Sequence, residues 1–162
     1  MIKQKGFTLI ELLIAVGILM LLVSVGIANY IGFNERQKLI QAAEIIRESV
    51  AFAQTYARSG KIKDCERLIA YQVSFSAGSE IVSVSPICES GGSAEINEFN
   101  LPSGVELANS NDIFFRAISG SVTDDLGKNE GEFTQLQITI SNSQNQELIM
   151  SIDRSGSLII EE

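Results

Sequence analysis

The chain has 162 residues, of which 45% are hydrophobic, and its formal net charge is −8; this length suits one modest domain with an appendage. From residue 64 to residue 162, four basic residues stand against sixteen acidic ones, a balance of −12. Because nucleic-acid binding relies on clustered Lys and Arg, we expect no nucleic-acid partner. The sequence has no histidine, the commonest general base and metal ligand, so we expect neither an enzyme nor a cofactor or metal site.

The hydrophobic residues are concentrated near the N-terminus. Residues 1–6 include Lys3 and Lys5 and no acid, and the 22 residues from Phe7 to Ala28 carry only three polar side chains. A helix of this length, rising ~1.5 Å per residue, can cross a ~30 Å hydrocarbon core. By the positive-inside rule the lysines keep the N-terminus in the cytoplasm, so the rest of the chain should lie on the far side. The three polar residues are Thr8, Glu11 and Ser24.

The helix is predicted to continue to about Arg58, with residues 7–33 as a transmembrane half and residues 34–60 as an amphipathic half. In the second half, apolar residues recur at three- and four-residue steps, so one face should lie against a soluble core. Ser59 and Gly60 predict the C-terminal stop. The apolar stripe consists of Leu39, Ala42, Ala43, Ile46, Val50, Ala53 and Ala57, widened by Ile45, Phe52 and Tyr56.

Beyond residue 60 the pattern changes to short strands separated by turn residues. We interpret Pro86 and residues 90–93 as breaks, residues 120–131 as a polar loop, and the last three strands as a meander. The fold class expected is α+β, a long N-terminal helix packed on an antiparallel β-sheet or sandwich head over residues 61–162. The expected strands are Leu68–Phe75, Glu80–Ser85, Glu95–Phe99, Val105–Leu107, Asp112–Ile118, Phe133–Ile140, Gln146–Ile152 and Ser157–Ile160.

The two cysteines, Cys65 and Cys88, both follow the apolar segment. On the far side of the membrane disulfides persist, so a Cys65–Cys88 bridge is predicted. It would close a loop of about 24 residues and contribute roughly 3 kcal/mol to stability on the loop-entropy model. Two buried free thiols are the alternative.

Glu11 decides between interpretations of the apolar segment. A secretory signal peptide would carry a small-residue cleavage site after the apolar run, and none is evident. An ordinary signal anchor explains the lysines but not a carboxylate in a membrane helix, which is costly and marks function. If the chain is cut after Gly6, the freed α-amine of Phe7 supplies a partner. Glu11 of one chain can then neutralise the Phe7 amine of a neighbour, which cancels both charges and sets the stagger between chains.

The string from Gly6 through Phe7 and Thr8 to Glu11, behind a short basic leader, resembles the N-terminus of type IV pilins and type II secretion pseudopilins. The resemblance implies that a membrane prepilin peptidase cuts between Gly6 and Phe7, removes residues 1–6 and N-methylates Phe7. It implies that Glu11 is the intersubunit glutamate, with Thr8 near it.

The same resemblance implies the partners and the location of the chain. The partners are prepilin peptidase, other pilin or pseudopilin subunits, an inner-membrane assembly platform and membrane lipid. The chain would begin as a single-pass inner-membrane protein with a cytoplasmic N-terminus and a periplasmic or extracytoplasmic head. It would then enter a cell-surface or periplasm-spanning filament as a structural subunit.

Three short patterns in the head resemble, more loosely, the GspH- or FimT-like minor-pseudopilin branch. The last pattern ends in leucine where that branch has valine, and the two cysteines match none of its patterns. The choice between a minor and a major subunit therefore stays open. The patterns are Leu101–Val105, Ile113–Phe115 followed by Gly120, and Ile152–Leu158.

Two other functions stay open. A membrane-anchored binding or adhesive protein that never polymerises would keep its N-terminus uncut. A DNA-uptake tip pilin would need a basic patch, which the acidic balance of the head disfavours. The loop over residues 123–130 could be interpreted as a calcium site, but its spacing does not fit the alternating calcium loop, and a solvated loop is favoured. The lysines that could activate a serine, Lys61, Lys63 and Lys128, lie in polar segments and indicate solvent exposure.

Overall fold

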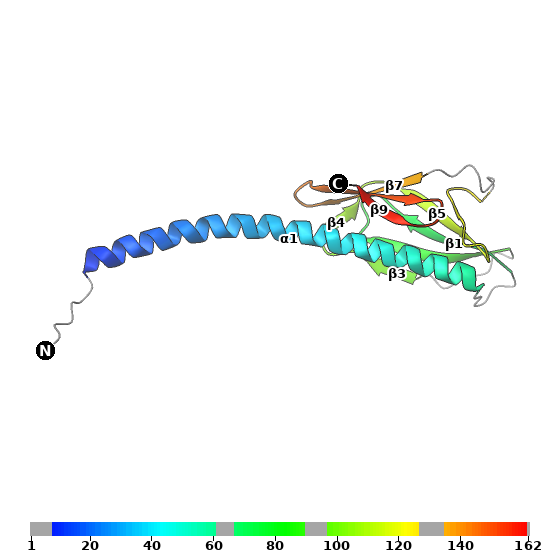
Figure 1. Cartoon of the computed structure of the whole chain (residues 1–162), viewed down its shortest axis with the longest axis horizontal. Helices are drawn as coiled ribbons and strands as arrows, with labels where there is room; N and C mark the ends of the chain where they lie inside the picture. Colours follow the sequence, from blue (N-terminus) through cyan, green and yellow to red (C-terminus); the bar gives the residue numbers. More distant parts are fainter. Residues whose placement is uncertain (1–7, 61–66, 90–96, 127–134, 162) are drawn as a thin grey trace. The chain divides into compact units, whose positions relative to one another are not determined.

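The structure, a computed structural model, divides into two compact units, Met1–Arg36 and Gln37–Glu162. One helix, α1 (Leu9–Ser59), contributes to both units, and the described strands belong to the second unit (Figure 1). The residues that the structure describes are 8–60, 67–89, 97–126 and 135–161, with the backbone alone for 25–29.

α1 extends over 51 residues because its sequence has no proline and is rich in Leu and Ala, which favour helix. In the first unit the described side chains from Thr8 to Ser24 are exposed, so apolar groups face outward on all sides of the helix. Within the described part of the chain, no helix combines the length and the apolarity that a membrane span requires.

The apolar stripe predicted for the second half of α1 is confirmed. Its seven residues are all buried, and the three that widen it pack against the same core. The helix ends at Ser59, and Gly60 follows with a φ of +59°, a conformation that glycine adopts without strain. The Gly60 N–H donates to the carbonyl of Ala57 at 3.2 Å. The predicted helix stop is therefore also confirmed.

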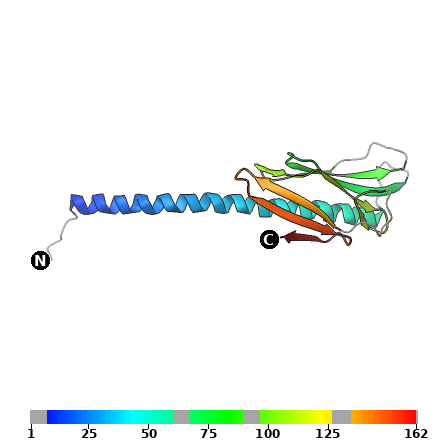
Figure 2. The same cartoon turned by 90° about the horizontal axis from the view of Figure 1, so that it is seen from above.

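The second unit contains two antiparallel sheets. The first has the order β3-β2-β1-β5-β6 and the second the order β4-β7-β8-β9. Figures 1 and 2 show both sheets along the part of α1 that lies in this unit. The strands are β1 (Leu68–Phe75), β2 (Ile81–Cys88), β3 (Asn97–Asn100), β4 (Val105–Leu107), β5 (Asn111–Arg116), β6 (Val122–Thr123), β7 (Gln135–Asn142), β8 (Glu147–Asp153) and β9 (Leu158–Glu161).

One hydrophobic core joins α1 to both sheets. Alternate residues along the strands point inward, and the largest fully buried side chains include Phe75 of β1, Phe115 of β5 and Ile46 of α1. Burying each such side chain contributes about 1.5–3 kcal/mol. The α+β fold with a helix packed on an antiparallel head is as the sequence predicts, and so is the closing meander β7-β8-β9.

β2 continues through Pro86, although the sequence pattern indicates a strand break there. Pro86 lies opposite Tyr71 of β1. Among the described residues, β3 pairs with β2 only from Ile81 to Val84. Pro86 therefore lies beyond the part of β2 that is paired with strands on both sides. Proline, which lacks an N–H, is tolerated where one side of a strand is unpaired. The interpretation of Pro86 as a break is therefore wrong.

Two other differences concern the segment after β5. The predicted strand to Ile118 ends instead at Arg116, because Ile118 turns the chain with a φ of +71°. The predicted polar loop over residues 120–131 contains β6, whose Val122 and Thr123 are buried and pair with Phe115 and Phe114. The bounds predicted for β1 and β4 are confirmed, and the ends of the other strands differ from expectation by a few residues. The predicted positions 95–96 and 133–134 lie outside the described residues.

Candidate functional site

The N-terminal end of α1 carries two of the predicted site residues, Thr8 and Glu11. Glu11 Oε2 accepts hydrogen bonds from the Thr8 backbone N–H at 3.1 Å and from Thr8 Oγ1 at 2.9 Å. In return, the Glu11 N–H donates to Thr8 Oγ1 at 3.3 Å. These reciprocal contacts form a capping box, in which the residue before the helix and the third helical residue satisfy each other's backbone donors.

The capping box has a local cause in the sequence. Helix N-termini leave N–H groups without intrahelical acceptors, and a threonine followed three residues later by a glutamate supplies two acceptors. A negative side chain in the first turn also suits the positive end of the helix dipole. Glu11 is therefore held on the N-terminal side of the helix, beside the backbone N–H of Thr8. Gly6 and Phe7 themselves lie outside the described residues.

The surroundings of Glu11 on the helix are apolar and exposed. Leu12 and Leu13 keep 60% and 65% of their surface exposed. A shallow apolar hollow of about 360 Å³ follows one side of the helix, and a Cβ added at Gly17 within it would meet no other atom. An exposed apolar surface of this size on a helix is typical of a segment that packs against other apolar groups. The hollow is lined by Leu9, Leu12, Leu13, Val16, Gly17 and Met20.

Of the two cysteines, the structure describes only Cys88. Cys88 ends β2 and is partly buried. No free cysteine occurs among the described residues. Cys65, its predicted partner, lies outside them, so the Cys65–Cys88 pairing stays a prediction.

A calcium site is the alternative interpretation of the loop over residues 123–130, and the structure describes this loop only up to Leu126. There, Thr123 Oγ1 donates to the Asp125 carbonyl at 2.7 Å and accepts the Asp125 N–H at 3.2 Å, a local turn closed by its own side chain. In the part of the chain that the structure describes, no group of three or more acidic, Cys or His side chains is arranged to hold a metal ion. Residues 127–130 of this loop lie outside that part.

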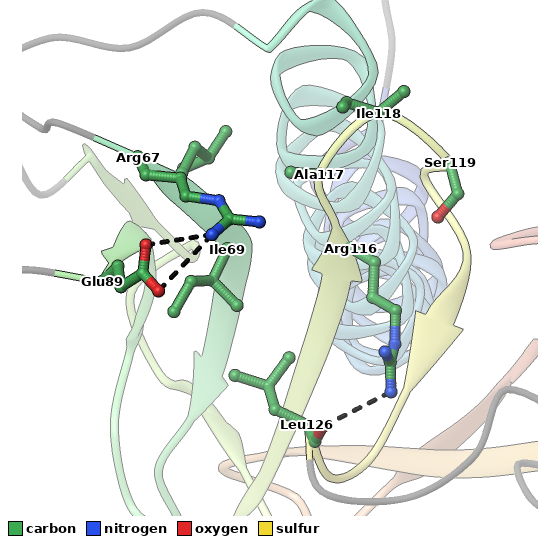
Figure 3. Close-up of a pocket in the computed structure, with 9 residues that line it drawn as sticks. Arg67, Ile69, Glu89, Arg116, Ala117, Ile118, Ser119 and Leu126 are labelled. Carbon is green, nitrogen blue, oxygen red and sulfur yellow. Dashed lines mark hydrogen bonds and ion pairs between the residues drawn. The ribbon is translucent and has the colours of Figure 1, made fainter.

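A second site, not predicted from the sequence, is a hollow of about 570 Å³ in the second unit (Figure 3). Two arginines line it, Arg67 just before β1 and Arg116 at the end of β5. Only their scarcity could have drawn attention to them, since four basic residues occur between residues 64 and 162. The lining residues are Arg67, Leu68, Ile69, Glu89, Arg116, Ala117, Ile118, Ser119 and Leu126.

Comparison with known proteins identifies the N-terminal segment. Residues 1–27 match the model of the prokaryotic N-terminal methylation motif, the prepilin-type leader of type IV pilins and pseudopilins. Neither the search of curated proteins nor the search of solved structures found a match. The likeness of the head to the GspH- or FimT-like branch accordingly stays a prediction.

Proposed function

We propose, on the methylation motif at residues 1–27, that this type IV pilin-like or pseudopilin-like chain is a structural subunit, a minor pilin or pseudopilin, of a type IV pilus or type II secretion filament. The observation that carries the proposal is that motif, with its glutamate near the start of the apolar first part of α1. Such a chain works by assembly and not by catalytic turnover. Prepilin-type processing and assembly with other pilin subunits follow from the motif.

The proposed mechanism begins with cleavage. Prepilin peptidase cuts between Gly6 and Phe7, N-methylates Phe7 and leaves a cationic amine one residue before Thr8. Glu11 of one subunit then pairs with the Phe7 amine of its neighbour. The capping box supports this role, because Thr8 donates both of its hydrogen bonds to Oε2. That arrangement holds the carboxylate at the helix end where the new amine forms.

Membrane anchoring is part of the same proposal. Before cleavage, the exposed apolar residues of α1 in the first unit would hold the subunit in the inner membrane as a reservoir, with the head on the periplasmic side. An assembly platform would then move the mature subunit into the filament. Removing apolar surface from lipid and packing it against other helices of the same kind is close to neutral in free energy, so charge pairing and close packing can decide the stagger.

The test of this mechanism is the incorporation of Glu11 variants into filaments. We expect Glu11→Ala to insert in the membrane normally but to be depleted in sheared filaments. Glu11→Gln separates charge from hydrogen bonding, because glutamine preserves a capping box but carries no charge; it should be depleted as well.

Ser24→Ala is the matched control. It removes another polar group from the same apolar segment, one whose Oγ donates within the helix to the Met20 carbonyl at 2.8 Å. This variant should assemble like the wild type. Wild-type amounts of Glu11→Gln in filaments would contradict the charge-pairing mechanism.

A further inference from the structure

The arginine-lined hollow lies at the end of the second unit where α1 ends. Ile118 donates its N–H to the carbonyl of Ala57, in the last turn of α1, at 2.9 Å. Figure 3 shows Arg67 and Arg116 on two sides of the hollow, with Ile69 and Ala117 between them. Half of the four basic residues between residues 64 and 162 therefore line one hollow. In a head with a balance of −12, this is a local concentration of positive charge.

Ile118 gives this hollow an exposed apolar rim. Its side chain is 84% exposed, and that of Ile69 is 41% exposed. The φ of +71° at Ile118 is unfavourable for a β-branched residue, and such strain is common at binding sites. The hydrogen bond to Ala57 and the turn closed by Gly120 N–H to Arg116 carbonyl, at 2.9 Å, hold the strained backbone in place. An exposed isoleucine held rigidly beside arginines is suited to contact a partner.

Arg67 can bind a second carboxylate besides that of Glu89. Its Nη1 pairs with Glu89 Oε2 at 3.2 Å, and the two side chains are 76% and 59% exposed. An exposed pair of this kind contributes little and exchanges easily. A guanidinium carries five N–H donors in a planar fork, so its other edge can bind a second carboxylate. Arg116 Nη2 donates to the Leu126 carbonyl at 3.4 Å and stays within the same hollow.

The opposite end of the second unit is acidic. Glu106 of β4 and Glu147 of β8 both pair with Ser141 of β7, so the three residues lie in one row across three strands. Both glutamates are exposed. Strands are spaced about 4.8 Å apart, so the two carboxylates start roughly 10 Å from each other on one face of the sheet.

The length of β1 gives the separation between these two ends of the second unit. Arg67 precedes its first residue, and Gly78, shortly after its last residue, donates to the carbonyl of Leu107 in β4 at 2.8 Å. Eight residues of strand extend about 25 Å at ~3.3 Å per residue. The arginine-lined hollow therefore lies at one end of the second unit, beside the first sheet, and the glutamate row lies at the other end, in the second sheet.

We propose that the hollow of one copy of this chain binds the Glu106–Ser141–Glu147 row of a second copy, head to tail. The partner is a second copy because its charge is complementary: two exposed carboxylates of one copy meet a hollow that two arginines of the other copy line. A contact between two different ends of a molecule is heterologous, and repeating it builds an open helical array and not a closed dimer. The inference rests on the proposed function, since only an assembling chain brings copies into this contact.

The test is oxidative cross-linking of the full chain in its own membranes. Ser119→Cys places a thiol at the hollow, and Ser141→Cys places one in the glutamate row. Because each chain carries both thiols, a head-to-tail contact gives a ladder of dimers, trimers and higher species. Each single cysteine variant should give no ladder. Dimers without higher species, or no cross-linked product, would overturn the proposal.

Charge exchange within the cross-linking variant makes the test specific. Arg67→Glu and Glu106→Arg should each reduce the ladder by roughly tenfold, because attraction becomes repulsion, and the two changes together should restore it. Arg47→Glu and Glu98→Arg are the matched controls, exposed charge reversals on α1 and β3 that should leave the ladder unchanged. A ladder that Arg67→Glu does not weaken, or that the paired change does not restore, contradicts the inference.

The N-terminus of the same samples separates this inference from the proposed function. A mature N-terminus at Phe7 without a ladder means that the chain is processed as a pilin while the head-to-tail contact is wrong. An uncut Met1 counts against the proposed function, and a charge-dependent ladder in that sample still supports the contact between heads.

Discussion

At the scale of single residues, Thr8 and Glu11 combine a local structural role with a proposed intersubunit role. In the single chain the carboxylate caps its own helix through Oε2. A capping box alone is a common way to begin a helix, and it explains the spacing of these two residues without any partner. What it does not explain is the choice of a charged residue in an apolar segment, since glutamine also completes a capping box and the helix dipole offsets only part of what a charge costs there. The charge is therefore the feature that points to assembly.

The hydroxyl of Thr8 can be tested by itself. Thr8→Val keeps the shape of the side chain but removes the acceptor of the Glu11 N–H, and a cap of this kind contributes about 1 kcal/mol. We expect the Glu11 amide to exchange its hydrogen roughly fivefold faster in detergent-solubilised protein, measured by NMR. Thr8→Ser retains the hydroxyl and should exchange like the wild type. Equal exchange in Thr8→Val and Thr8→Ser would show that the hydroxyl does not cap the helix.

At the scale of elements, the turn between β8 and β9 joins the second sheet to α1. Asp153 Oδ1 accepts hydrogen bonds from Ser155 Oγ at 2.6 Å, from the Ser155 N–H at 2.8 Å and from the Ser157 N–H at 2.9 Å. Gln54 of α1 donates to the Ser155 carbonyl at 2.7 Å. A Cβ at Gly156 would lie 2.8 Å from Gln54 Nε2, so glycine is needed there both for that approach and for its φ of +81°.

This turn makes the stability of the head depend on pH. The hydrogen bonds from the Ser155 side chain, and then from the Ser157 backbone, lower the pKa of Asp153 below its ordinary 3.8. A lowered folded pKa stabilises the fold above the unfolded value, and that stabilisation is lost as the pH falls through the folded pKa. Asp153→Asn should therefore melt below the wild type at pH 7, and the difference should shrink below about pH 4. Circular dichroism melts at several pH values measure this; a difference that stays constant down to about pH 3 would contradict it.

The sequence predicts those elements whose signal is periodic and long. The helix stripe from Leu39 to Ala57 is correct residue by residue, because burial on one side of a helix imposes a period that the spacing of apolar residues in the sequence reveals. β4 is correct in its bounds because a proline-glycine turn precedes it. β6 was missed because two residues carry no period, and its burial depends on pairing with β5.

Other features depend on contacts between distant parts of the chain. Nothing local indicates that β1 pairs with β5, or that β4 joins β7. Arg67 and Arg116 come together only through the pairing of β1 with β5, so the hollow could not be located from the sequence. The N-terminal site is the opposite case, since Thr8 and Glu11 are one helical turn apart and their contact follows from spacing alone.

At the scale of the whole molecule, the predicted Cys65–Cys88 bridge bears on the stability of the head. A bridge closing about 24 residues would contribute roughly 3 kcal/mol by restricting the unfolded chain. We expect a reducing agent and Cys88→Ser each to lower the urea midpoint of the solubilised chain, and by similar amounts, because both remove the same bridge. Ser83→Ala on the same strand serves as a control that leaves the cysteines unchanged. Titration of two free thiols in the unreduced, denatured protein would contradict the pairing.

Across the whole chain, the two units have different surfaces and, under the proposed function, different tasks. The first presents exposed apolar side chains around a capped glutamate, and the second presents an arginine-lined hollow and a row of glutamates at opposite ends. Apolar helices supply packing without direction, whereas a polar head-to-tail contact supplies direction. The acidic balance elsewhere keeps heads apart except where the charges are complementary.

The proposed function depends on processing that creates a new N-terminus for assembly, and the mass and sequence of that N-terminus are the decisive measurement. The protein is purified from membranes that contain prepilin peptidase, beside a Gly6→Leu variant that should resist cleavage. We predict that the wild type begins at Phe7 and carries an N-methyl group, while Gly6→Leu keeps Met1. A wild-type protein that keeps Met1 in the presence of the peptidase would show that the proposed function is wrong.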